Sequence, residues 1–210
     1  MAEKKKRFPA YIPVCAAWIV GMQLLAYYGT RFLPAPPPHD LSTAWDLRIP
    51  LVPAWTAVYL LAFVSWAAGF CLIAAADRTR TVRVSFAYGA ALLLCGVCFV
   101  LFPCTMTRPE VVGEGLFADL TRLVYRLDPP RNLLPSLHVL ASWFCWRGMT
   151  GCRTVPLWVK ILYFVFLVLV CLSILFVRQH VLADIPTAGA AAELGLLLAR
   201  AVRPERLFRE

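Results

Sequence analysis

Six long apolar runs, separated by polar or proline-rich segments, divide the 210-residue chain. A helix needs about 20 consecutive apolar residues to cross a bilayer. We therefore expect an all-α integral membrane protein, folded as a six-helix bundle that forms a single domain over residues 1–210. The six predicted spans have the approximate residue bounds 8–28, 51–76, 84–102, 134–152, 155–177 and 180–199.

The polar segments between these runs predict loops and one further helix. Residues 31–50 contain five prolines and are expected to form a loop, and residues 77–83 are expected to form a short basic turn. In the segment 103–133, apolar side chains recur every three or four residues while charged ones fall on another face. This pattern predicts an interfacial amphipathic helix between spans 3 and 4. Its apolar positions are Leu116, Phe117, Leu120, Val124 and Leu127, and its charged positions are Asp119, Arg122 and Arg126.

The composition supports membrane insertion and argues against a nucleic-acid partner. Hydrophobic residues make up 60% of the chain and charged residues 16%, which is too apolar for an ordinary soluble domain. The net charge of +9 is explained by topology, because membrane proteins keep basic residues in their cytoplasmic loops. Seven of the eight cysteines fall in or beside apolar runs and are expected to be small buried hydrophobes. No cysteine or histidine spacing suggests a zinc site, so neither metal nor cofactor is expected.

The distribution of Lys and Arg predicts the orientation. Fourteen of the 21 lie on the side that holds the N-terminal leader Lys4–Arg7, residues 77–83, residues 147–160 and the C-terminal tail. We therefore expect both termini in the cytoplasm. The first run lacks an obvious small-residue cleavage site, so it is expected to stay as a span rather than to be removed as a signal peptide. The loop 103–133, His138 and His180 then lie at the extracytoplasmic face.

Two of the three histidines begin apolar runs, within Pro135–Val139 and Arg178–Asp184, whereas His39 lies in the proline-rich loop and is expected to be solvated. Asn132 is a candidate helix cap and Pro135 suits a first helical turn. The free amides of Ser136, Leu137 and His138 would then favour an anion at the positive end of the helix.

His180 and Asp184 are four residues apart, so on one helix they would share a face. An aspartate bonded to one imidazole nitrogen fixes the tautomer and leaves the other nitrogen free as a nucleophile or base. The same spacing also suits a purely structural pair that ties helix ends together. Glu193 is about 13 Å further along the helix. It lies too deep for a phosphate site, and pairing inside the bundle and a functional role are both open for it.

Several arginines lie on the outer side, where topology disfavours them, and suggest an anionic ligand. Arg108 and Arg178 are the stronger candidates for phosphate binding. Arg122, Arg126 and Arg131 are possible headgroup contacts. Arg122 and Arg126 are equally well explained by contact with lipid headgroups of the outer leaflet.

Arg108-Pro109, Pro135-Ser136-Leu137-His138 and His180-x-x-x-Asp184, in this order in a six-span chain, resemble the type 2 phosphatidic acid phosphatase (PAP2) superfamily of membrane lipid phosphatases and phosphotransferases. Three positions depart from the usual motifs. Leu101 stands at a lysine position, Leu137 at a glycine position and Ile174 at an arginine position, for which Arg178 is a possible replacement. Pro-Ser-Leu-His with Arg-Gln-His looks closest to the branch of the inositol phosphorylceramide and sphingomyelin synthases.

The resemblance implies a two-step displacement on a lipid phosphoester or pyrophosphate, without a metal. His180 would form a phosphohistidine, Asp184 would orient it, and His138 would protonate the leaving alcohol and then activate the acceptor. The acceptor is water in a phosphatase and a lipid hydroxyl in a headgroup phosphotransferase. Arg108, Ser136, Leu137 and Arg178 would bind the phosphate. The rival interpretation is a non-catalytic lipid-binding or transport protein with the same bundle.

Overall fold

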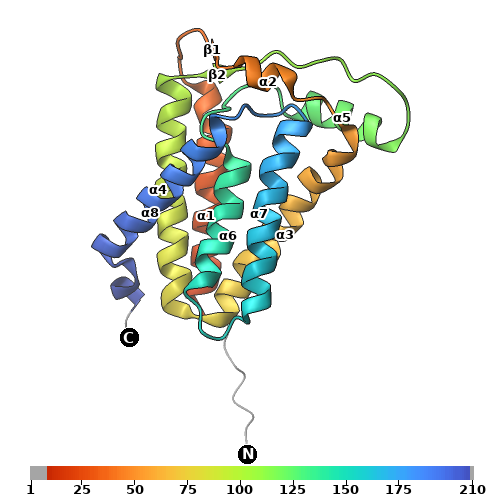
Figure 1. The fold of residues 1–210 in the computed structure, drawn as a ribbon. Coiled ribbons are helices and arrows are strands. Elements are labelled where there is room, and N and C mark those ends of the chain that lie inside the picture. Colours follow the sequence, from red (N-terminus) through yellow and green to blue (C-terminus); the bar gives the residue numbers. More distant parts are fainter. Residues whose placement is uncertain (1–8, 209–210) are drawn as a thin grey trace, which may run out of the picture.

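The computed structural model describes residues 9–208, so the leader Lys4–Arg7 and Arg209 lie outside the described part (Figure 1). This part of the chain is all-helical, as predicted. Its α-helices are α1 (Tyr11–Tyr27), α2 (Ala44–Arg48), α3 (Thr56–Ala76), α4 (Arg78–Leu101), α5 (Leu116–Leu127), α6 (Leu137–Thr150), α7 (Leu157–Phe176) and α8 (Asp184–Val202). Short 3-10 turns cover Gly29–Phe32, Pro53–Trp55 and Pro204–Phe208, and β1 (His39–Asp40) pairs in parallel with β2 (Cys104–Thr105).

Within residues 9–208, five helices are long and apolar enough to cross a membrane, which makes the chain a multi-pass membrane protein. They are α1 with its following turn, α3 with its preceding turn, α4, α7 and α8. Large apolar side chains on their outer faces are exposed, among them Leu61, Val165 and Leu194. This exposure is expected of surfaces that contact lipid, because hydrocarbon tails are as apolar as leucine.

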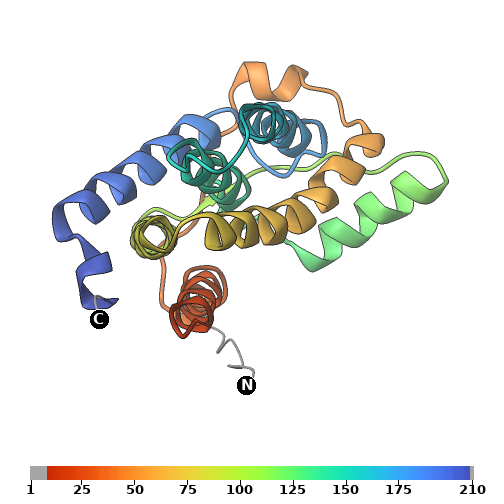
Figure 2. The same ribbon diagram turned by 90° about the horizontal axis from the view of Figure 1, so that it is seen from below.

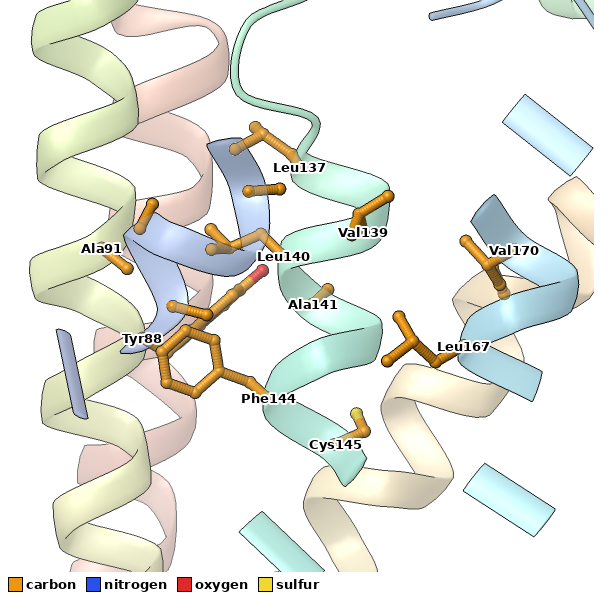
Figure 3. Packing of buried hydrophobic residues seen from close by; sticks show 14 of the residues in the cluster. Tyr88, Ala91, Leu137, Val139, Leu140, Ala141, Phe144, Cys145, Leu167 and Val170 are labelled. Carbon is orange, nitrogen blue, oxygen red and sulfur yellow. The ribbon is translucent and has the colours of Figure 1, made fainter. Parts of the chain in front are cut away.

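The fourth predicted span, residues 134–152, contains the shorter helix α6. Its 14 residues extend only about 21 Å, which is less than a hydrocarbon core of about 30 Å. Nevertheless α6 lies at the centre of the bundle, in contact with α3, α4, α7 and α8 (Figure 2). Phe144 and Leu140 pack toward Tyr88 and Ala91 of α4, while Leu167 and Val170 of α7 lie on the other side (Figure 3).

Three predicted boundaries are wrong, and side-chain caps explain two of them. Residues 78–83 are not a turn but the first turns of α4, because the Asp77 carboxylate accepts a hydrogen bond from the Arg80 amide at 2.7 Å. The proline-rich loop contains α2, whose start carries a reciprocal capping box between Thr43 and Asp46. The last span begins at Asp184 rather than at residue 180.

The predicted amphipathic helix exists as α5. Thr121 and Val124 are buried against the bundle, and the Thr121 hydroxyl lies 2.7 Å from that of Thr56 in α3. Leu116, Leu123 and Leu127 are exposed on another side of the helix. The helix therefore presents an apolar surface outward as well as one inward. His39 is exposed, as expected, and its ring stacks on Phe102 with centroids 4.8 Å apart.

Candidate active site

A cavity of about 310 Å³ opens at the end of the bundle where α1 finishes and α6 begins, at the top of Figure 1. It lies between α1, α3, α5 and the segments that lead into α6 and α8. Its walls combine aromatic rings with charged and amide groups. The lining residues are Gln23, Tyr27, Tyr28, Tyr59, Leu60, Phe63, Trp66, Arg108, Val124, Leu127, Asp128, Pro129, Arg131, Asn132, Leu137, His138, Gln179 and His180.

His180 and Asp184 form a hydrogen-bonded pair, but not on one helix as the spacing suggested. His180 lies in the turn that precedes α8, and its amide donates to the carbonyl of Ile174 at 3.2 Å. Its Nδ1 lies 2.8 Å from Asp184 Oδ2, which also accepts the Val181 amide at 3.0 Å. Asp184 is fully buried. The carboxylate therefore fixes the imidazole orientation and leaves Nε2 as the free ring nitrogen.

His138 lies in the first turn of α6, with its ring centroid 5.7 Å from that of His180. Tyr59, Trp66 and Phe63 pack around the His138 ring, with centroids at 4.4, 5.4 and 5.7 Å. Its Nε2 is buried and has no hydrogen-bond partner within the described chain. A buried nitrogen that lines a cavity without a partner suggests that a ligand completes its hydrogen bonding.

The start of α6 differs from the prediction in its cap. Ser136, not Asn132, is the N-cap, and its hydroxyl accepts the Val139 amide at 3.4 Å. The Ser136 amide is itself engaged, because it donates to the Asp184 carbonyl at 3.3 Å. Of the three amides predicted to face an anion, those of Leu137 and His138 remain at the helix start, and both residues line the cavity. Asn132 instead donates to the Tyr27 carbonyl at 3.2 Å.

Arg108 lies in the cavity wall and is held rigidly. Its Nη1 donates to the Asp128 carbonyl at 2.7 Å, Nη2 donates to the Gln179 side chain, and the guanidinium lies over the Tyr125 ring at 4.8 Å. Burial lowers the pKa of Arg108, and the nearby Asp128 counteracts this. Arg108 Nε and Gln179 Nε2 are both buried without a partner among residues 9–208. The cavity thus offers a fixed cation together with unused N–H donors.

The structure does not bring Arg178 into the cavity. This buried side chain points toward α2 and donates to the backbone carbonyls of Asp46 and Ile49. The Leu101 and Ile174 positions do not line the cavity either, since Leu101 is exposed at the end of α4 and Ile174 is fully buried.

Of the three arginines predicted as possible headgroup contacts, one lines the cavity and two lie outside it. Arg131 lines the cavity. Arg122 pairs with Asp119 at 2.8 Å and donates to the Val111 carbonyl at 3.0 Å, while Arg126 is exposed and outside the lining.

The sequence did not predict a cluster in the cavity wall that Asp128 forms with two tyrosines. The Tyr59 hydroxyl donates to Asp128 Oδ2 at 3.0 Å, and the Tyr27 hydroxyl donates to Oδ1. One signal was visible: Asp128 is the only carboxylate between Asp119 and Asp184. Its tyrosine partners are 101 and 69 residues away in the chain, so no local pattern pointed to them.

Glu193, for which two interpretations were open, pairs with Arg147 at 2.6 Å and accepts from Trp143 Nε1 at 2.9 Å. It is absent from the cavity lining. The geometry supports the pairing role.

Asp46 anchors the turn that carries His180, and we expect a pH-dependent contribution to stability from it. Its Oδ1 accepts the Leu182 amide at 2.7 Å. Burial raises the pKa of the Asp46 carboxyl, but hydrogen bonds from Thr43 and Leu182 and the charge of Arg178 bring it below its ordinary value. A lowered folded-state pKa means that the ionised carboxylate stabilises the fold above the unfolded pKa of about 3.9. This stabilisation is lost as the pH falls through the folded-state pKa.

The Asp46→Asn variant is therefore expected to lose about 1–3 kcal/mol of stability at pH 7, and to approach the wild type as the pH falls below about 4. Thermal unfolding in detergent measures the stability loss at pH 7 and its decrease at pH 3.5. Asp119→Asn, at an exposed carboxylate, is the matched control. An Asp46→Asn deficit that is the same at both pH values would contradict the assignment.

Within residues 9–208, no group of three or more His, Cys, Asp or Glu side chains is arranged to hold a metal ion. All eight cysteines are free, and five of them are buried. Comparison with protein-family models finds no match, and comparison with curated proteins finds no significant relative. The site is therefore interpreted from its own geometry and from its motifs.

Proposed function

We propose that the chain is a membrane lipid phosphatase or phosphotransferase of the PAP2 type, with the cavity as its active site. The observation that carries this proposal is the arrangement of two histidines in one cavity wall. His180 is oriented by Asp184 at 2.8 Å, and the ring of His138 lies 5.7 Å away, centroid to centroid. A purely structural His–Asp pair gives no reason for a second histidine beside it whose Nε2 is buried and unpaired.

The geometry suits a double displacement at phosphorus. The lone pair of His180 Nε2 forms the P–N bond while the bond from phosphorus to the leaving alcohol oxygen breaks. His138 Nε2 donates its proton to that oxygen, and the phosphate anion supplies the negative charge that stabilises a protonated His138. His138 then takes a proton from water or from a lipid hydroxyl, whose oxygen attacks phosphorus and releases His180.

The remaining polar groups of the cavity suit the phosphoryl oxygens. Arg108 and Gln179 provide fixed N–H donors, and the amides of Leu137 and His138 lie at the positive end of α6. Arg131 adds a second cation to the lining. In this proposal Arg178 supports the turn from outside the cavity and makes no phosphate contact.

The apolar part of the cavity wall favours a lipid over a soluble phosphoester. Leu60, Phe63 and Leu127 line the cavity and are 36%, 50% and 72% exposed. Apolar side chains therefore run from the cavity to the outer surface between α3 and α5. They give a hydrocarbon tail a route to the bilayer while the headgroup occupies the polar part.

The proposed topology has six crossings, with α6 completed by the irregular segments on either side of it. Both termini are cytoplasmic and the cavity opens at the extracytoplasmic face, with α5 lying at the membrane surface. The distribution of Lys and Arg supports this orientation.

The test is to trap the covalent intermediate. The purified protein is offered labelled phosphatidate, a prenyl pyrophosphate, and a phospholipid together with an acceptor lipid, and is then quenched in alkali. We expect an acid-labile phosphoryl group on His180, and inhibition by vanadate, which mimics five-coordinate phosphorus. Release of free phosphate identifies a phosphatase, and a new lipid identifies a transferase. Insensitivity to vanadate together with a strict requirement for a divalent metal would overturn the mechanism.

A further inference from the structure

A second group of arginines converges at the end of the bundle opposite the cavity. Arg80 and Arg83 of α4, Arg147 of α6 and Arg200 of α8 line a pocket of about 40 Å³. This is the lower end in Figure 1, where α4 begins and where α6 and α8 finish. The proposed reaction does not use any of these residues.

Arg80 is fixed in this pocket by the backbone of α6. Its Nε donates to the Gly148 carbonyl at 3.0 Å, and its Nη2 donates to the Arg147 carbonyl at 2.6 Å. The guanidinium also lies directly against Gly151, where a Cβ atom would overlap Cζ, Nη1 and Nη2 of Arg80. Only glycine permits so close an approach. The hydrogen-bond acceptors that hold the Arg80 guanidinium are thus neutral backbone carbonyls.

Two other arginines of the pocket are oriented by carboxylates. Arg147 pairs with Glu193 at 2.6 Å, and Arg83 pairs with Glu205 at 2.5 Å. Within residues 9–208, no carboxylate forms an ion pair with Arg80 or Arg200. The charge of Asp77 also acts on Arg80 and Arg83. Four guanidinium groups therefore face three carboxylates, and the pocket keeps a net positive charge. Oriented planar guanidinium groups match the oxygens of a phosphate.

The geometry points to a binding site for a phosphate group of an anionic phospholipid, in the leaflet opposite the active site. Val84, Leu196 and Ala199 form the apolar part of the pocket wall. Leu197 and Leu198 on the same turns of α8 are exposed, at 55% and 47%, where an acyl chain can lie against them. A basic pocket between transmembrane helices, flanked by apolar surface, suits an anionic lipid headgroup. Inorganic phosphate offers the same phosphate oxygens as the headgroup but has no acyl chain.

The test measures thermal unfolding of the purified full chain in neutral detergent, with added phosphatidylglycerol, phosphatidylcholine or inorganic phosphate. Phosphatidylglycerol at saturation is expected to raise the Tm by roughly 5–10 °C, and phosphatidylcholine by far less. Arg200→Gln should remove most of the shift, and this variant is expected to fold because Arg200 is exposed. Arg153→Gln, at an exposed arginine of the same end outside the pocket, should keep it.

These measurements distinguish a lipid headgroup from a soluble phosphate, and a specific site from diffuse electrostatic attraction. A shift with inorganic phosphate that matches the lipid shift, and that Arg200→Gln removes, supports the phosphate site but assigns it to a soluble anion. Equal shifts with the anionic and the zwitterionic lipid would overturn the proposal. Equal losses in Arg200→Gln and Arg153→Gln would overturn it too, because they would indicate diffuse attraction by all basic residues of this end. Gly151→Ala, which displaces the Arg80 guanidinium, is expected to weaken lipid binding and serves as an independent second variant.

Discussion

His180→Asn is expected to lower turnover of a lipid phosphoester by about 10⁴-fold or more, because it removes the atom that forms the bond to phosphorus. In the structure His180 Nε2 is the ring nitrogen left free by the contact with Asp184. The amide nitrogen of asparagine is not nucleophilic, so the loss should fall on kcat. Rates of phosphate release or lipid transfer with purified protein in detergent micelles measure this.

The third histidine gives a matched control. His39 is exposed, stacks on Phe102 and lies outside the cavity, so His39→Asn should keep full turnover. Comparable Tm values for the two variants and the wild type would show that folding is intact. If His180→Asn keeps more than about one tenth of the wild-type rate, then His180 is not the nucleophile.

The sequence predicted the spans well where the length of an apolar run decides them, as for α3 and α7. It failed at boundaries that individual side chains decide. Asp77 extends α4 by capping it, although the residues that follow are polar and basic. The short α6 is set by the Ser136 cap at its start. Hydrophobic periodicity does not register a single cap, because one hydrogen bond at a helix end leaves the average polarity unchanged.

In the site, too, contacts between residues close in sequence could be predicted, whereas contacts between distant residues could not. The contact between His180 and Asp184 could be predicted from their spacing, although a turn makes it rather than a helix. The position of Arg178 could not, because its partner Asp46 lies 132 residues away. Asp128 and Tyr27 are likewise 101 residues apart. The spacing of a motif predicts which of its residues contact each other within one element. Which of several arginines enters the cavity depends instead on how distant elements pack.

His138→Gln is expected to lower turnover of alkyl phosphoesters by about 10²–10⁴-fold, since it removes the group placed to protonate the leaving oxygen. Because glutamine fills a similar space and keeps a donor, the variant should still bind the phosphate. Leaving-group dependence distinguishes an acid from a binding residue. An alkoxide is a poor leaving group and needs the proton, whereas 4-nitrophenolate leaves without one.

With 4-nitrophenyl phosphate the deficit of His138→Gln should therefore shrink to less than about tenfold in the step that forms the phosphoenzyme. A burst of nitrophenol in the first turnover measures that step separately from the later attack of water, for which His138 is the proposed base. His180→Asn should show no burst with either type of substrate. Equal deficits of His138→Gln on the alkyl and the aryl substrate in the first step would mean that His138 orients the substrate and transfers no proton. Its buried and unpaired Nε2, beside the ring of His180, would then serve to bind a phosphoryl oxygen.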